Sequence, residues 1–134
     1  MRILALDYGS ARCGVALSDP TGTIATPLQP IERVATRAGL GRVAALVRER
    51  GVERIVVGLP LSLAGSETSQ TAETRAFAER LRARLPDVPV DLYDERLTTR
   101  LAARDPSRNA SEDSRAAAHL LQSWLKGGFR GSER

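Results

Sequence analysis

The residues best suited to chemistry in this chain are carboxylates at the ends of predicted elements. Asp7 comes near the end of an apolar run over residues 2–8, and Glu95 follows a second run over residues 88–93. Asp113 lies at the start of the last predicted helix. A buried carboxylate is costly unless it is paired or binds a cation, and Mg²⁺ prefers oxygen ligands. The three acids are therefore candidate catalytic and metal-binding residues.

Acids from separate elements that converge on one edge of a sheet could carry phosphoryl-transfer chemistry. In open sheets, ligand sites lie at the carboxyl ends of the strands, and two metal ions held there by carboxylates can stabilise both the attacking and the leaving oxygen. Each acid also has a plainer interpretation. Asp7 could cap a turn, and Glu95 or Asp113 could stabilise the N-terminus of a helix through the helix dipole. Glu112 is an alternative to Asp113.

Other catalytic centres find little support in the sequence. The chain has one cysteine, Cys13, and one histidine, His119. A single cysteine excludes an internal disulfide and a thiolate metal centre, and a single histidine excludes a histidine-rich one. Nothing near His119 resembles a nucleophile elbow, so we interpret it as structural. The chemistry must then depend mainly on carboxylates.

The charge balance is modestly basic, with 20 Lys and Arg against 16 Asp and Glu. All the basic residues except Lys126 are arginines, whose planar guanidinium binds two phosphate oxygens at once. This bias favours nucleic acid as a partner, although the base composition of a genome can produce it too. The N-terminal apolar run is too short for a signal or a membrane span. We therefore expect a cytoplasmic protein with no membrane association.

Hydrophobic periodicity and turn residues divide the chain into strands and helices. Strands are expected over residues 2–8, 12–18, 23–31, 53–58 and 88–93, the third of them an edge strand because of its prolines. Helices are expected over 39–50, 70–85 and 112–125, with a helical turn or two over 97–104. Three strands with short turns imply an antiparallel meander. This order predicts an α/β fold with a mixed five-stranded sheet and helices on both faces, formed by one domain over 1–126 and followed by a flexible tail over 127–134.

Four segments of the sequence match a known family. They are Leu6-Asp7-Tyr8-Gly9-Ser10 with Arg12 and Gly14-Val15-Ala16; Val57-Gly58-Leu59-Pro60 with Gly65 and Glu67; Asp94-Glu95-Arg96-Leu97-Thr98-Thr99; and Asp113 with Ala116-Ala117 and Leu121-Gln122. In these segments the chain resembles the YqgF/RuvX family, RuvC-like proteins of RNase H-like fold. Members are described as Holliday-junction resolvases and as nucleases for the 5′ end of the small-subunit ribosomal RNA precursor.

The resemblance implies a role for individual residues. The three acidic positions of the family fall on Asp7, Glu95 and Asp113, which would bind Mg²⁺ or Mn²⁺. Motif positions expected to line the substrate groove fall on Arg12, Gly65, Glu67 and Arg96. The chain departs from the family at residues 105–112, where members usually carry a lysine- and glycine-rich stretch. That departure weakens the case for a basic loop there and leaves Glu112 open as a substitute ligand.

The resemblance favours a metal-dependent endonuclease that processes the 5′ end of precursor 16S rRNA in ribosome biogenesis. One alternative is a Holliday junction resolvase acting on four-way DNA, and another is a non-catalytic nucleic-acid-binding or ribosome-assembly factor. A kinase-like ATPase is disfavoured, because such enzymes need two domains around the nucleotide. The partner is expected to be nucleic acid, and the protein could be a monomer or a homodimer.

Overall fold

An antiparallel meander forms one half of the sheet. In the computed structural model, which describes residues 1–97, 110–127 and 132–133, it consists of β1 (Ile3–Asp7), β2 (Arg12–Ser18) and β3 (Ala25–Glu32). β1 and β2 are short, almost wholly buried runs, whereas β3 is mostly exposed at the edge of the sheet. Its prolines, Pro27 and Pro30, are tolerated there because an edge strand leaves some N–H positions unpaired.

The other half of the sheet is built from strands parallel to β1. β4 (Arg54–Leu59) pairs with β1, and β5 (Val90–Asp94) pairs with β4, both in parallel. The short strand β6 (Ser132–Glu133) then runs antiparallel to β5. The full order is β3-β2-β1-β4-β5-β6, so β1 lies at the centre and its carboxyl end has a neighbouring strand on each side.

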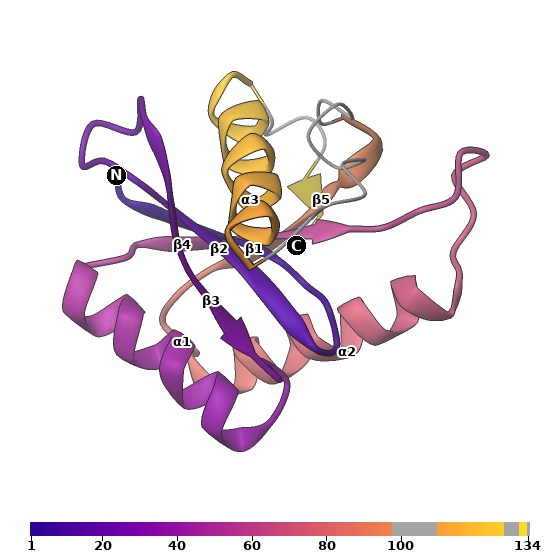
Figure 1. The fold of residues 1–134 in the computed structure, drawn as a ribbon, viewed down its shortest axis with the longest axis horizontal. Coiled ribbons are helices and arrows are strands. Elements are labelled where there is room, and N and C mark those ends of the chain that lie inside the picture. The colour runs from indigo at the N-terminus through magenta and orange to yellow at the C-terminus, as the bar shows by residue number, and fades with distance from the viewer. Residues whose placement is uncertain (98–109, 128–131, 134) are drawn as a thin grey trace.

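The helices cover both faces of the sheet (Figure 1). α1 (Arg37–Arg50) and α2 (Ser69–Arg84) lie on one face, and α3 (Ala110–Leu125) lies on the other. α1 begins at the N-cap Thr36 and ends at Gly51, which adopts a left-handed conformation. Side chains that alternate along β1 fill two separate cores: Leu4 and Leu6 pack towards α1 and α2, and Ile3 and Ala5 pack towards α3.

The expected mixed sheet with helices on both faces is confirmed, and its five expected strands are all present. Within the described residues a short sixth strand joins them, because two residues of the tail pair with β5. This pairing gives the exposed edge of β5 backbone partners and has no hydrophobic pattern that a sequence could reveal. Of the predicted helical turns over 97–104, the structure describes only Leu97, which is the last residue of a short 3₁₀ helix, Glu95–Leu97. Residues 98–104, like most of the tail, lie outside the described residues.

None of the helices in the described part of the chain combines the length and the apolar character that crossing a membrane requires.

Candidate active site

Asp7 lies in the middle of a row of three residues that crosses the sheet, with a glycine on either side. On β2 its partner is Gly14. On β4, the register that pairs Leu6 with Val57 continues to bring Gly58 beside it. The row sits where β1 ends, at the carboxyl edge of the parallel strands, which is the edge that open sheets use for ligands.

The members of this row share the face of the sheet that α3 covers. Successive residues of a strand point to opposite faces, and each member lies two positions from a residue in the core beneath α3. Those three core residues are Ala5, Ala16 and Val56. The Asp7 side chain, which is half-buried, therefore projects to the α3 side between two positions that have no side chain.

Asp113 stands over the first glycine of the row. A Cβ atom on Gly14 would lie 2.0 Å from the carbonyl oxygen of Asp113, so only glycine lets the first turn of α3 approach the sheet this closely. The next residue, Ser114, is buried and accepts a hydrogen bond of 3.3 Å from the N–H of Val15, at a point where the β2–β3 register shifts. These two contacts fix Asp113 beside Asp7.

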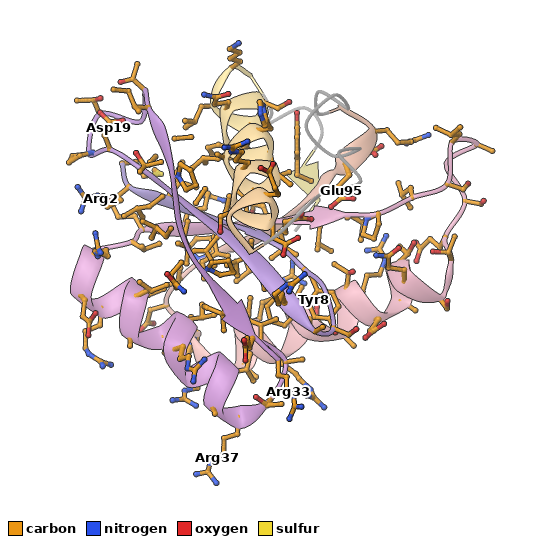
Figure 2. The ribbon with its side chains drawn as sticks, in the orientation of Figure 1. Arg2, Tyr8, Asp19, Arg33, Arg37 and Glu95 are labelled. Atoms are coloured by element: carbon orange, nitrogen blue, oxygen red, sulfur yellow. The ribbon has the colours of Figure 1, made fainter. Side chains whose placement is uncertain are left out.

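Glu95 stands over the second glycine. It follows β5 directly, as the first residue of the 3₁₀ turn, and its Oε1 would lie 2.7 Å from a Cβ atom on Gly58. A side chain at position 58 would therefore push the Glu95 carboxylate away. Figure 2 shows Glu95 on the α3 side of the sheet, and Tyr8 on the side of α1 and α2. The three predicted acids thus lie on one face of the sheet, with Asp113 over Gly14 and Glu95 over Gly58, on either side of Asp7.

Arg12 partly neutralises this acidic group. Its Nε donates to Oδ2 of Asp113 at 3.0 Å, with the Arg12 side chain 49% exposed and that of Asp113 19% exposed. The acids also act through the sheet on Cys13. Burial raises the pKa of its thiol well above the ordinary value, and the negative charges of Asp7 and Asp113 raise it further.

The acids offer the right donors for a divalent cation, although their arrangement is not that of a closed metal site. Within the described residues, no group of three His, Cys, Asp or Glu side chains is arranged to hold a metal ion. Carboxylate oxygens are nevertheless the ligands that Mg²⁺ and Mn²⁺ prefer, and the two glycines leave the space that a side chain would fill. The residues fit such an ion if the carboxylates move closer together and the ion pair between Arg12 and Asp113 opens.

Arg96 ties the loop between β4 and α2 to the end of β5. Its guanidinium binds Asp94 through Nε and NH2, the closest contact being 2.6 Å, and NH1 donates to the carbonyl of Leu63 at 3.4 Å. The hydrogen bonds from Arg96 hold the pKa of the Asp94 carboxyl below its usual value. Gly65 makes room for this contact: its φ of +86° suits glycine, and a Cβ atom there would lie 3.1 Å from NH1 of Arg96.

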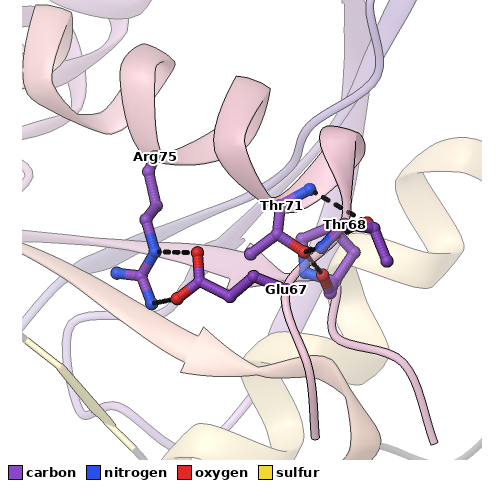
Figure 3. A network of polar contacts seen from close by, with 5 residues as sticks. Glu67, Thr68, Thr71 and Arg75 are labelled. Atoms are coloured by element: carbon purple, nitrogen blue, oxygen red, sulfur yellow. Dashed lines mark hydrogen bonds and ion pairs between the residues drawn. The ribbon is translucent and has the colours of Figure 1, made fainter.

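Glu67 lies in a different contact, at the start of α2. Its two carboxylate oxygens accept from Nε and NH2 of Arg75 at 3.0 and 2.8 Å (Figure 3). The adjacent Thr68 caps α2 in a capping box with Thr71, whose hydroxyl donates to the carbonyl of Pro60. Glu67 is therefore part of the structure that anchors the loop to α2.

The four predicted substrate-groove residues thus fall into three separate contacts: Arg12 with Asp113, Gly65 with Arg96, and Glu67 with Arg75. Glu112, the rival of Asp113, forms an ion pair of 2.9 Å with Arg115 on its own helix. Sequence reasoning missed the part played by the two row glycines and by Ser114. An isolated glycine inside a strand pattern signals a close approach of another segment, and that signal was available at positions 14 and 58.

Comparison with known proteins places the chain in a family. The model of the RuvX family, described as "Holliday junction resolvase", matches residues 1–127. A protein of Anaeromyxobacter sp. named "Putative pre-16S rRNA nuclease" is 45% identical over 135 residues, covering 95% of this chain and 98% of its own. A protein of the same name from Corynebacterium jeikeium is 39% identical, covering 92% of this chain and 85% of its own.

The fold also matches a solved structure. The RuvC structure of Thermus thermophilus aligns over 99% of both chains with a TM-score of 0.61 at 14% sequence identity, a likeness that concerns the fold alone. This likeness identifies the fold of the chain as RNase H-like, with a sheet that combines an antiparallel meander and parallel strands. On the family match and the extent of these relatives, the chain belongs to the RuvX family.

Proposed function

We propose that this protein is a metal-dependent nuclease that hydrolyses phosphodiester bonds, with Asp7, Glu95 and Asp113 as its catalytic, metal-binding acids. One observation carries the proposal: three carboxylates from β1, the end of β5 and α3 gather on one face over a row with glycine on both sides of Asp7. Clustered carboxylates repel a polyanion unless a cation lies between them. Membership of a family whose relatives bear nuclease names supports the same activity.

The residues of the site would have different roles in metal binding and substrate binding. Asp7, on a central strand, would be the fixed ligand, while Glu95 and Asp113 close on the ion from either side. Bound divalent cations would supply Lewis-acid stabilisation of the phosphoryl oxygens and of the leaving group. Arg12, half-exposed beside Asp113, would exchange its carboxylate partner for a phosphate of the substrate. A guanidinium makes strong charge-assisted bonds to either group.

The substrate we favour is precursor 16S rRNA, cleaved near its 5′ end, because the similar relatives carry that name. Such a role would place the protein in the cytoplasm. The description of the family model favours a second candidate, resolution of a four-way DNA junction. A junction resolvase should be a two-fold dimer that presents two sites to a symmetric substrate, whereas an RNA nuclease can act as a monomer.

The decisive experiment measures cleavage by the wild type and by Asp7→Asn, Glu95→Gln and Asp113→Asn, with Mg²⁺ or Mn²⁺. The substrates are a precursor 16S rRNA fragment, a single-stranded RNA and a four-way DNA junction. Each variant should lose at least about 10²-fold in rate, because each removes a charge that holds the ion. Glu112→Gln is the matched control, since it removes the neighbouring acid on α3 and should cleave at nearly the wild-type rate.

The outcomes separate the candidates. RNA cleavage that disappears in the three variants but persists in Glu112→Gln supports the rRNA role, whereas paired symmetric nicks in the junction by a dimer support the resolvase. Full activity in any one variant removes that residue from the site. Metal-independent binding of RNA with no cleavage of any substrate would favour a non-catalytic ribosome-assembly factor.

A further inference from the structure

A second charged surface lies on the opposite side of the molecule from α3. Arg80 on α2 donates from NH1 to the carbonyl of Ala35 at 2.7 Å, and Ala35 lies midway in the chain between Arg33 and Arg37. Arg84, one turn further along α2, extends towards α1, because its NH2 lies 3.8 Å from a Cβ atom placed on Gly41. The arginine track is defined as these four exposed residues, Arg33, Arg37, Arg80 and Arg84.

The track has few acids to neutralise it. Of the acids on α2, Glu79 is paired with Arg82, and Glu73 accepts a hydrogen bond from the hydroxyl of Tyr8. In the part of the chain that the structure describes, no salt bridge joins Arg33, Arg37 or Arg84 to a carboxylate. Figure 2 shows Arg33 in the turn before α1 and Arg37 at the beginning of that helix. Exposed cations of one sign attract a polyanion and raise its local concentration.

Arg33 is held in a backbone conformation that glycine would adopt more easily. Its φ is +47°, the only positive value at a non-glycine residue among those described. The N–H and hydroxyl of Thr36 both bond the Arg33 carbonyl, which fixes the turn into α1. The left-handed conformation is unfavourable for a residue with a side chain, and such strain clusters at functional sites. Arg33 is therefore present even though its backbone conformation is less favourable for arginine than for glycine.

The track begins beside the candidate active site. The N–H of Arg33 donates to the carbonyl of Ala11 at 3.0 Å, and Ala11 precedes Arg12 in the turn that follows β1. At the other side of that turn, Tyr8 adjoins Asp7 in the chain, and the charge of Arg80 acts on its phenol. A strand bound at the acids can thus leave the site over this turn and continue across α1 and α2.

We propose that the arginine track binds the phosphate backbone of the nucleic-acid substrate on one side of the cleavage point. The identification of the ligand as that substrate rests on the proposed nuclease function. Contacts of this kind fix the register of a strand without reading its sequence, and they weaken steeply with salt. The track would bind the part of the substrate that lies beside the cleavage point, at a distance from the catalytic acids.

Binding can be measured without cleavage, by fluorescence anisotropy in EDTA with a labelled single-stranded RNA and a labelled four-way DNA junction. Arg37→Gln and Arg84→Gln should each weaken binding roughly two- to fivefold and lower the salt slope by about 0.7 for the single strand, since each removes one phosphate contact. Arg48→Gln is the matched control: it removes the same charge from an exposed position in the last turn of α1 and should bind as the wild type does.

Arg33→Gly separates binding from folding. Glycine relieves the left-handed backbone, so the melting temperature should stay the same or rise, while binding falls about as much as in Arg37→Gln. Unchanged binding in all three track variants would overturn the proposal, and so would an equal loss in Arg48→Gln, which would reduce the effect to net charge. In EDTA, the track substitutions should weaken nucleic-acid binding by the same factor in an Asp7→Asn background as in the wild type. If the wild type cleaves no substrate but the track variants still lose binding, the nuclease function is refuted and the track remains a nucleic-acid-binding surface.

Discussion

Arg12 and Asp113, 101 residues apart in the sequence, form an ion pair of 3.0 Å at the mouth of the acidic group. The pair joins the beginning of β2 to the first turn of α3, directly beside the glycine that admits that turn to the sheet. A guanidinium and a divalent cation would compete for the same carboxylate. Under the proposed function, the pair would link two events at the site: a phosphate that binds Arg12 would release Asp113 for the metal ion.

Arg12→Gln should strengthen the binding of Mn²⁺ to the protein in the absence of nucleic acid. The gain should be roughly two- to fivefold, because a half-exposed ion pair contributes at most about 1 kcal/mol. Electron paramagnetic resonance of free Mn²⁺ measures it directly. Arg115→Gln, which releases Glu112 instead, should leave the affinity unchanged. Weaker Mn²⁺ binding in Arg12→Gln would argue that Arg12 supports the site in some other way.

Alanine should destabilise the protein more at Gly14 than at Gly58. At Gly14 the added Cβ would meet backbone atoms of Asp113 and Ser114, none further than 3.2 Å, so α3 must shift. Thermal unfolding should show a loss of about 1–3 kcal/mol or more. At Gly58 the three atoms nearest to the Cβ all belong to the Glu95 side chain, which can rotate away, so stability should fall by less than about 1 kcal/mol.

Cleavage should be lost in Gly58→Ala even though the protein stays nearly as stable as the wild type. A displaced Glu95 carboxylate should cost Gly58→Ala about 10²-fold in cleavage rate, since small displacements of a catalytic group are expensive, while the variant stays folded. Gly41→Ala is a control on α1, because its Cβ would have only the end of Arg84 within contact distance. A Gly58→Ala protein that is fully active would show that the position of Glu95 over this glycine is not the catalytic one.

The elements around the site could be predicted because their signals are local. β1, β2 and β4 are short runs of apolar residues between turns, and their predicted bounds differ from the observed ones by at most two residues. The placement of Asp7 at a strand end follows from the bounds of β1. That of Glu95 follows from β5, which is expected over 88–93 and observed over Val90–Asp94. The helices on both faces follow from two strand faces that are both apolar, which a sheet exposed on one side would not show.

The contacts within the site could not be predicted, because they join distant segments through single atoms. Nothing in the sequence near Glu67 indicates that Arg75 will hold it, and nothing near Arg12 indicates Asp113. The strand β6 is two residues long and bonds through its backbone, so it has no periodicity to detect. The glycines at 14 and 58 were visible, but their meaning depends on which segment packs above them.

Arg54→Met should destabilise the protein severely. Arg54 donates to Asp91 at 2.7 Å, and the Asp91 side chain is only 3% exposed, with its second oxygen buried and without a hydrogen-bond partner among the described residues. Removal of the arginine leaves a buried charge unpaired, which costs about 3–5 kcal/mol. Chemical denaturation measures the loss. The double variant Arg54→Met/Asp91→Leu should recover most of it, and a double variant as unstable as the single one would contradict this account.

Tyr8 should titrate far above an ordinary tyrosine. Burial, together with the hydrogen bond to Glu73, raises the pKa of its phenol to about 12. Because the folded pKa exceeds the unfolded value of about 10, the corresponding stabilisation is complete below pH 10 and is lost as the pH rises through 12. Absorbance at 295 nm, compared between the wild type and Tyr8→Phe, isolates this titration, and circular dichroism at each pH identifies the range in which the chain is folded. Glu73→Gln should lower the midpoint, since it removes the charge that opposes ionisation; a Tyr8 midpoint near 10 in the folded wild type would contradict the contact seen here.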